Sequence, residues 1–339
     1  MTLPDDSYTR LAPDLPLCRV LNGLWQVSGA HGPIDPRAAI PTMRAYHDAG
    51  LTTWDLADHY GPAEDFVGAF RRALAADRGD AALDQVQAFT KWVPPPERMT
   101  RQVVEENVTI SRRRMGMDRL DLLQFHWWEY AHPGYLDALA YLAELRDAGQ
   151  IRHLALTNFD TEHLAIILGR GIRVVSNQVQ YSLIDRRPEV QMAAYCQAHG
   201  VQLLTYGTLC GGLLTERYLG QPEPERAALT TASLRKYKPM IDAWGGWALF
   251  QDLLRTLKQI ADRHGVSIAN IAVRTILDRP AVAGVIVGTR LGLSEHIADT
   301  TRVFSLRLTP QDHAEIAAVL ARSRDLFHRI GDCGAEYRR

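Results

Sequence analysis

The stretch LTTWDLADHYG, residues 51–61, joins an apolar run to a group of titratable side chains. Its first part, LTTWDL (51–56), has the length and the apolar character of a buried β-strand. Asp55 stands at the end of this run, and Tyr60 follows in the loop after it. The stretch therefore predicts a strand that brings an acid and a phenol to one edge of a sheet.

The same order, a short apolar run followed by a helical segment, recurs along the chain. The runs are continuous rather than alternating, which is typical of parallel strands covered on both faces. Eight such strands, most of them followed by a helix, favour a closed (β/α)8 TIM barrel over an open doubly wound sheet. Besides 51–56, the predicted strands are RVLNGLWQ (19–26), VQAFTK (86–91), LDLLQFH (120–126), and the runs IRHLALTNF, RVVSNQVQ, VQLLTYG and AGVIVG that start near 151, 173, 201 and 283.

Helix signals lie between these runs. Asp35 followed by Pro36 predicts the start of a helix that extends to about Gly50. Thr309 and Asp312 resemble a capping box at the start of a final C-terminal helix. The other predicted helices cover 63–75, 100–115, a segment around 135–145, and 266–278.

Two segments depart from the regular repeat. Residues 213–246 are rich in prolines and charges, which predicts a long excursion after strand seven, over the mouth of the barrel. No linker or shift of composition divides the rest, so we expect one domain over 19–339, preceded by an N-terminal extension, 1–18.

Composition excludes several classes of partner. The formal net charge of −1 gives no electrostatic reason to bind nucleic acid or an anionic membrane. No apolar run approaches the ~18 residues of a membrane span, and the first residues lack the basic and apolar regions of a secretory signal. The four cysteines are widely scattered, which fits a reducing compartment. We therefore expect a cytoplasmic enzyme.

Titratable residues of four types are predicted to meet at one rim. In a (β/α)8 barrel the chemistry takes place at the carboxyl ends of the strands. Asp55 ends the second strand, with Tyr60 just beyond it, while Lys91 ends the third strand and His126 the fourth. These four side chains should therefore lie together.

The four residue types suit one reaction. A tyrosine with a pKa of ~10 is a poor acid at neutral pH, but a lysine ammonium nearby favours the phenolate and should lower that pKa. A buried aspartate keeps the lysine charged, and a histidine can orient a carbonyl oxygen. Such a set could protonate a carbonyl oxygen while a hydride arrives at its carbon.

The segments WDLADHYG, TKW (90–92) and DLLQFHWW (121–128) resemble three signature stretches of the aldo-keto reductase superfamily. The resemblance implies a (β/α)8 barrel, a nicotinamide cofactor bound without a Rossmann fold, and a small-molecule aldehyde or ketone as substrate. It also implies that Tyr60 is the general acid, that Lys91 and Asp55 tune it, and that His126 orients the carbonyl group.

The resemblance extends over roughly residues 19–305 and implies the cofactor contacts. LTNF (156–159), NQVQYS (177–182), TYGTLCGGLL (205–214) and VIVGTR (285–290) are similar to the family's cofactor-binding segments. Asn158 and Gln178 would contact the carboxamide, Tyr206 would stack on the nicotinamide, and Arg290 favours NADPH over NADH because a guanidinium suits a phosphate. The remaining residues implied to bind the cofactor are Gly207, Leu209, Gly211, Gly288 and Thr289.

Three departures from the family pattern concern the cofactor. Gly207-Thr208 stands where Ser-Pro is commoner, which changes the loop over the pyrophosphate. Val287 replaces a proline, and Asp299-Thr300 stands where Glu-Asn usually contacts the adenine.

Large aromatic side chains near the rim suggest a substrate pocket. We predict that Trp25, Trp92 and Trp127 form its walls, whereas Asp58 and His59 are turn residues. Trp244 and Trp247, in the excursion, could either cover the mouth or anchor the loop. His126, Glu129 and His132 are spaced around a helix rather than on one side of it, so we expect no metal site there.

Two other functions are compatible with such a barrel. One is a regulatory subunit that binds the cofactor without turnover, as channel β-subunits of the same superfamily are thought to do. The other is a phosphate-binding barrel with unrelated isomerase or aldolase chemistry. The sequence has no Walker lysine, no GxGxxG and no GxSxG, so P-loop, Rossmann and serine-hydrolase sites have no support.

Overall fold

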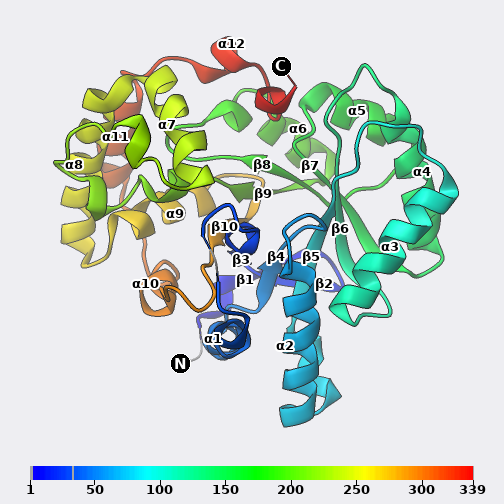
Figure 1. Cartoon of the computed structure of the whole chain (residues 1–339). Coiled ribbons are helices and arrows are strands. Elements are labelled where there is room, and N and C mark those ends of the chain that lie inside the picture. Colours follow the sequence, from blue (N-terminus) through cyan, green and yellow to red (C-terminus); the bar gives the residue numbers. More distant parts are fainter. Residues whose placement is uncertain (1–2, 33, 339) are drawn as a thin grey trace.

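Eight parallel strands form a closed barrel in a computed structural model that describes residues 3–32 and 34–338 (Figure 1). The barrel order is β10-β3-β4-β5-β6-β7-β8-β9, which confirms the predicted (β/α)8 fold. All eight predicted strands are present: β3 Val20–Gly23, β4 Thr53–Asp55, β5 Gln87–Trp92, β6 Leu120–His126, β7 Ile151–Thr157, β8 Ser176–Gln180, β9 Gln202–Tyr206 and β10 Val282–Gly288.

Helices surround the barrel, and their ends follow the capping signals of the sequence. The Asp35 carboxylate accepts from the backbone N–H of Arg37 at the start of α1, and Thr309 and Asp312 form the predicted capping box at the start of α11. The helices are α1 Pro36–Asp48, α2 Ala63–Arg78, α3 Arg101–Met115, α4 Gly134–Asp147, α5 Thr161–Gly169, α6 Met192–His199, α7 Ala232–Trp244, α8 Gly246–His264, α9 Ile268–Leu277, α10 Ile297–Arg302, α11 Pro310–Leu320 and α12 Leu326–Ile330.

No helix in the described part of the chain is both long enough and apolar enough to cross a bilayer. The four cysteines are buried thiols that form no disulfide.

Side chains alternate between the inside of the barrel and the layer between barrel and helices. The lower half of the inside is apolar, with Leu21, Phe89, Leu122 and Leu204 in one buried cluster. Residues two positions further along the same strands also point inward, and several of these are polar. The barrel interior is therefore apolar at the amino ends of the strands and polar at their carboxyl ends.

A two-stranded hairpin closes the amino end of the barrel. Strands β1 (Tyr8–Ala12) and β2 (Leu15–Cys18) pair antiparallel within the segment that we predicted only as an extension, 1–18; its first two residues lie outside the described ranges. Leu15 and Leu17 are fully buried in the same cluster as the inner strand residues. The hairpin thus covers the apolar floor of the barrel.

The excursion after β9 is largely helical and builds a second hydrophobic core. Helix α7 packs on α8, and Trp244 and Trp247 are both buried in the core that these helices share. The two tryptophans therefore anchor the excursion and do not cover the mouth. The first turn of α7 reaches across to the loop after β3, where the backbone N–H of Ala232 donates to the carbonyl of Ala30 at 3.2 Å.

The chain does not end with the helix that starts at Thr309, which corrects our expectation of a final helix there. After α11 it continues through α12 and a 3-10 turn, Ala335–Tyr337, on the side of the barrel away from the N-terminus (Figure 1). Arg187 donates to the Glu336 carboxylate at 2.8 Å, and the backbone N–H of Thr161 donates to Asp332 at 2.8 Å. These bonds hold the C-terminal segment over the strand ends.

Replacing Gly68 by alanine is expected to lower the free energy of unfolding by about 1–3 kcal/mol, the usual cost of overpacking. Gly68 lies in α2 where α3 crosses it, and a Cβ there would collide with the backbone carbonyl of Arg114. A backbone group cannot move aside as a side-chain end can. Urea-induced unfolding followed by circular dichroism measures the change.

Gly169→Ala is the matched control, because Gly169 is also helical but a Cβ there meets nothing within 4 Å. This variant should be unchanged or more stable by up to about 1 kcal/mol, because alanine favours the helix. Equal losses in the two variants would contradict the close approach of α2 and α3 as the cause.

Candidate active site

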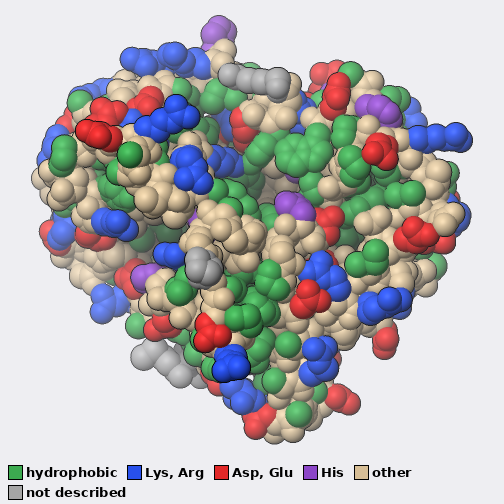
Figure 2. Space-filling view, in the orientation of Figure 1, with side chains coloured by type: hydrophobic (Ala, Val, Ile, Leu, Met, Phe, Trp, Pro, Cys, Tyr) green, Lys and Arg blue, Asp and Glu red, His purple; other side chains and the backbone are tan. Residues whose placement is uncertain are grey.

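The carboxyl ends of the strands surround a hollow, and the four predicted catalytic side chains lie there. Asp55 is the last residue of β4, Lys91 is in β5 and His126 ends β6. Lys91 shares its face of the sheet with Phe89, two residues earlier, which is in the inner cluster. The space-filling view shows this face hollowed near its centre, with Lys or Arg side chains on one rim and hydrophobic side chains on another (Figure 2).

A buried ion pair forms the floor of this hollow. Lys91 Nζ lies 2.6 Å from Asp55 Oδ2 and 3.0 Å from the carbonyl oxygen of Leu56, with the side chains only 3% and 5% exposed. The other carboxylate oxygen, Oδ1, accepts from Gln124 at 3.0 Å and from Gln178 at 2.7 Å. The buried ammonium of Lys91 and both carboxylate oxygens of Asp55 thus have hydrogen-bond partners, which offset the cost of burying their charges.

Gln124 is part of this network, and our sequence reasoning missed it. Its signal was a single glutamine inside the otherwise apolar end of LDLLQFH, at a fully buried position. Gln124 faces the same side as His126, two residues on, and its amide joins Asp55 to Gln178. Gln124 therefore holds the Asp55 carboxylate in position beneath the site.

Tyr60 lies above the ion pair, with its ring centroid 5.2 Å from Lys91 Nζ. Burial raises its pKa well above 10, and the negative charge of Asp55 adds to the effect. This corrects our expectation that Lys91 lowers the pKa of Tyr60 in the free protein. The reason is that Asp55 neutralises the lysine at 2.6 Å, so the phenol experiences burial more strongly than the ammonium charge.

His126 is a neutral imidazole in this environment. Burial lowers its pKa to about 3, and the positive charges of Arg338, His59, Lys91 and Lys236 act in the same direction. Tyr206 donates to Asn158 Oδ1 at 2.8 Å, which turns the Asn158 amide nitrogen toward His126 Nδ1 at 3.4 Å. Nδ1 is then the acceptor and Nε2 carries the ring proton. Nε2 is buried with no partner among the described residues.

The ends of β7 and β8 present groups that suit a carboxamide. Asn158 has a φ of 58°, a left-handed conformation that asparagine tolerates better than most residues. Gln178 uses its amide nitrogen to donate to Asp55 and Gln124, so its oxygen is left as an acceptor. The hydroxyl of Thr157 is buried without a partner in the described structure. The open Gln178 oxygen and Thr157 hydroxyl, next to the Asn158 side chain, fit an amide group of a cofactor.

The loop after β9 packs tightly against α7. Gly207 has a φ of 73°, and a Cβ there would stand 2.6 Å from the hydroxyl of Tyr237. Gly211 has a φ of 67° and is similarly close to Ser233. Thr208, which stands where a proline is commoner in the resembled family, donates to the carbonyl of Tyr181 at 2.9 Å. The two glycines therefore allow helix α7 to approach the loop.

Leu209 lies between the main core and the second core and is partly buried by both. It belongs to the same loop and fixes that loop against the barrel.

The residues after β10 lie beside β3. The backbone N–H of Thr289 donates to the carbonyl of Gly23 at 2.8 Å, and a Cβ on Gly288 would collide with the amide end of the Gln26 side chain. The exposed Arg290 donates to the carbonyl of His31 at 2.9 Å. Asp299, which stands where the resembled family usually has a residue that contacts the adenine, accepts from Ser267 at 2.9 Å and from Asn270 at 3.1 Å.

The predicted tryptophan walls need correction. Trp127 is fully buried, and its indole N–H donates to the carbonyls of Glu129 and His132. Trp92 is likewise buried in the main core, against Phe125. Both follow an inward-pointing residue that we predicted as catalytic, so the alternation of side chains turns them outward, toward the helices.

Trp25 and Trp128 lie nearer the hollow. Trp25 is half-buried in a 3-10 turn after β3, with its ring 4.8 Å from that of His31. Trp128 is 37% exposed, and its ring lies 4.4 Å from the ring of His126. The side chain beside His126 is thus the second tryptophan of HWW, one position beyond the residue that we predicted.

Asp58 and His59 shape the turn that carries Tyr60. His59 Nδ1 lies 2.8 Å from Asp58 Oδ1, and the other oxygen of Asp58 accepts from the backbone N–H of Val93 at 3.1 Å. The ring of His59 also packs edge-on against Tyr60 at 4.8 Å.

Three residues at the mouth were absent from our predictions. The hydroxyl of Tyr337 lies 3.0 Å from that of Tyr206, and its ring is 5.8 Å from the ring of His126. Lys236 contacts the same Tyr337 hydroxyl, and Arg338 donates to the carbonyl of Trp127 at 2.9 Å. None of the three lies at a strand end, so the pattern of the sequence offered no signal for them.

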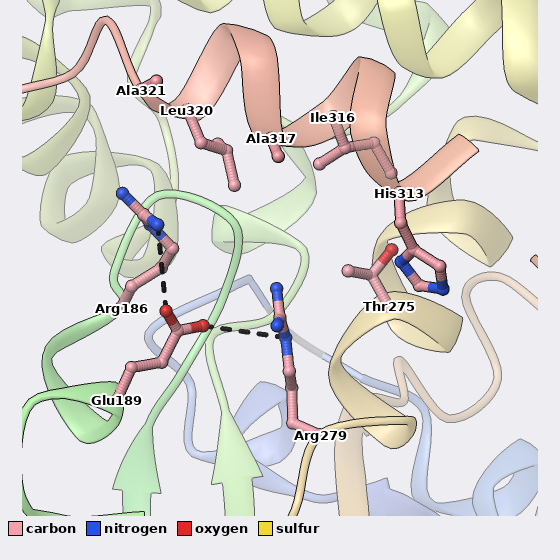
Figure 3. Close-up of a pocket in the computed structure, with 9 residues that line it drawn as sticks. All are labelled: Arg186, Glu189, Thr275, Arg279, His313, Ile316, Ala317, Leu320 and Ala321. Atoms are coloured by element: carbon pink, nitrogen blue, oxygen red, sulfur yellow. Dashed lines mark ion pairs between the residues drawn. The ribbon is translucent and has the colours of Figure 1, made fainter. Parts of the chain in front are cut away.

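A separate cavity of about 360 Å³ lies on the outer wall and contains none of the predicted site residues (Figure 3). In it, the Glu189 carboxylate forms two ion pairs: Oε2 lies 3.7 Å from Arg186 Nη1, and Oε1 lies 3.6 Å from Arg279 Nε. Its walls come from Arg186, Glu189, Thr275, Arg279, His313, Ile316, Ala317, Leu320 and Ala321.

Comparisons with known proteins agree with this fold. A sequence model described as the Aldo/keto reductase family matches residues 19–321. Aldo-keto reductase YhdN of Bacillus subtilis (strain 168) is 29% identical, over 92% of this chain and 93% of its own. The NADH-specific methylglyoxal reductase of Escherichia coli (strain K12) is 23% identical, over 88% and 93%.

The solved structure of the glycerol dehydrogenase AKR11B4 from Gluconobacter oxydans is also similar. It superimposes with a TM-score of 0.76 at 26% identity, covering 94% of this chain and 96% of that one.

The single variant Lys91→Met is expected to lower the free energy of unfolding by about 3–5 kcal/mol, because it leaves the Asp55 carboxylate buried without its counter-charge. The double variant Asp55→Asn/Lys91→Met should lose less, since neither charge is then buried. Urea unfolding of the two single variants and the double variant measures the coupling between the residues. Losses that simply add would contradict a strong interaction between them.

Proposed function

This chain belongs to the aldo/keto reductase family, and we propose that it reduces an aldehyde or ketone to an alcohol, with a hydride from a nicotinamide cofactor and a proton from Tyr60. The observation that carries the proposal is the meeting of a buried phenol and a free imidazole N–H at one rim. Tyr60 and His126 Nε2 both face this rim, above the Lys91–Asp55 pair. Such a set of donors suits an oxygen on which negative charge develops.

The residues that would hold the cofactor lie along the same rim. A bound reduced nicotinamide supplies the hydride. The oxygen of Gln178 and the side chain of Asn158 would bind its carboxamide, and Tyr206 would lie against its ring. Arg290 would meet a phosphate at the end of β10. The unpartnered Thr157 hydroxyl supports this assignment.

Tyr60 is suited to donate its proton only once negative charge develops on the substrate's carbonyl oxygen. Its raised pKa keeps the phenol protonated at neutral pH, so the acid is present before the reaction begins. As charge builds on the carbonyl oxygen, that oxygen becomes a strong enough base to take the proton. Lys91 uses two of its three hydrogens on Asp55 and Leu56, and the third can stabilise the phenolate that forms.

His126 would orient the carbonyl group. With Nδ1 directed at Asn158, the Nε2–H is free to donate to the carbonyl oxygen. The low pKa of the ring keeps it neutral, so it polarises the carbonyl without becoming a competing acid.

Tyr60→Phe is expected to lower turnover of a generic aldehyde about 100-fold or more, because it removes the proton donor and keeps the ring. The Kd for NADPH, measured by quenching of tryptophan fluorescence, should stay within about twofold of wild type. Tyr46→Phe is the control, because Tyr46 is buried away from the rim and its hydroxyl makes one long contact, 3.5 Å, to a backbone nitrogen. Wild-type turnover by Tyr60→Phe would refute the assigned role.

The same assay separates the proposal from a regulatory function. A wild-type protein that binds NADPH but oxidises none of it with several generic aldehydes would be a cofactor-binding subunit and not a reductase. A protein that shows no quenching with either nicotinamide cofactor would point to other chemistry on the barrel.

We further propose that NADPH is preferred to NADH. Arg290 is exposed at the end of β10 and spends one N–H on the carbonyl of His31, which leaves the rest of its guanidinium for a phosphate. One relative is named as NADH-specific, so the preference must be measured for this chain.

Arg290→Leu is expected to raise the Kd for NADPH about 10- to 100-fold, the loss of one charge-assisted contact. The Kd for NADH should change little, since it has no 2′-phosphate. Parallel fluorescence titrations measure both. An equal rise for the two cofactors would instead place Arg290 at the pyrophosphate.

A further inference from the structure

We propose that the carbonyl substrate carries an acidic group, a carboxylate or a phosphate, and that Lys236 binds it at the mouth of the site. This inference rests on the reduction proposed above and names the substrate class of that same site.

Lys236 differs from every other lysine of the chain, which has only four. Lys91 pairs with Asp55, Lys238 with Glu223 and Asp242, and Lys258 with Asp262. Within residues 3–32 and 34–338, Lys236 forms no ion pair with a carboxylate and meets the phenol of Tyr337. Its charge is therefore open to a ligand.

The position of Lys236 is fixed by three aromatic rings. Its ammonium lies 4.7 Å from the ring centroid of Tyr206, 5.4 Å from that of Tyr237 and 4.6 Å from that of Tyr337. Each contact is an attractive cation–π interaction. Rings hold an ammonium in place but leave its charge unneutralised, unlike the carboxylates that hold the other three lysines.

This fixed ammonium is next to the reacting groups. Tyr337 lies between Lys236 and His126, with its ring 5.8 Å from the imidazole and its hydroxyl in contact with the ammonium. A short substrate with its carbonyl at His126 would therefore reach Lys236 with a group a few bonds away. The hydroxyl of Tyr337 provides a second donor for that group.

The balance of charge at the mouth favours an anion. The carboxylate of Asp55 is neutralised by Lys91, while Asp185 and Glu336 share Arg187 and so leave one negative charge. Against it stand the positive charges of Lys236 and Arg338.

Arg338 is close enough to His126 to depress the imidazole pKa more than any other charge does. Its Nε and Nη1 are buried without hydrogen-bond partners among the described residues. The basic side chains visible at the rim of the hollow agree with a positive mouth (Figure 2).

The test compares matched substrates that differ in the acidic group. Succinic semialdehyde is measured against butanal for a carboxylate, and glyceraldehyde 3-phosphate against glyceraldehyde for a phosphate. For the wild-type protein kcat/KM should be higher with the acidic member of at least one pair, and the pair that responds tells which acid is used. In Lys236→Met this preference should fall about 10- to 100-fold, the value of one charge-assisted hydrogen bond.

Two further variants distinguish charge from packing. Lys236→Arg should restore much of the preference, because it restores the positive charge. Lys238→Met should leave the preference unchanged, because Lys238 lies in the same helix with its charge already paired. Binding of succinate or inorganic phosphate, measured by quenching of tryptophan fluorescence, should weaken in Lys236→Met in step with the kinetic preference.

Several outcomes would overturn the inference. A wild-type protein that reduces the neutral aldehydes and shows no preference for the acidic ones would refute it while leaving the proposed reductase function intact. A Lys236→Met variant in which kcat/KM falls equally for both members of a pair would show that Lys236 only holds Tyr337. A rise in the Kd for NADPH with an unchanged preference would place Lys236 at the cofactor. Failure to reduce any aldehyde would instead refute the reductase itself.

Discussion

The ion pair between Lys91 and Asp55 is the constraint on which the site depends. Two full charges lie 2.6 Å apart with almost no exposure to water, and such a pair is tolerated only when each group is saturated by partners. Gln124 and Gln178 provide those partners from β6 and β8. Four of the eight strands are therefore tied together beneath the rim by one set of hydrogen bonds.

That network decides what the groups above it can do. Burial, together with the negative charge of Asp55, keeps Tyr60 a phenol, while burial and the surrounding positive charges keep His126 an unprotonated imidazole. Because both amide hydrogens of Gln178 point down into the network, its oxygen is left for a ligand. The polar layer thus supports the reactive groups and also sets which donors and acceptors face the hollow.

The mouth is built by segments that lie outside the repeating unit. Helix α7 contributes Lys236, and the end of the chain contributes Tyr337 and Arg338. Tyr337 links the C-terminal segment to α7 through its contact with Lys236, and to β9 through its contact with Tyr206. In the proposed function the strands would therefore set the chemistry, whereas the excursion and the C-terminal segment would set the shape and charge that a substrate meets.

The sequence by itself determined the barrel and most of its rim. Continuous apolar runs at regular intervals are specific for parallel strands, and a residue at the end of such a run is placed by the fold, which is why Asp55, Lys91 and His126 could be found. The hairpin over the amino end was missed because β1 is polar and mostly exposed or half-buried, and Pro13 and Pro16 interrupt the segment, so no continuous apolar run marks it.

Only the tertiary structure decided which tryptophan faces the hollow, how the pKa of Tyr60 shifts and what covers the mouth. Trp127 and Trp128 are adjacent in the sequence, and their opposite directions follow from the alternation of side chains at the strand end. The pKa of Tyr60 depends on burial and on the charge of Lys91, which is neutralised by Asp55, a residue 36 positions from that lysine in the chain. Lys236 and Tyr337 are 101 residues apart, and no local pattern encodes a contact that exists only because two peripheral segments pack over the same strand ends.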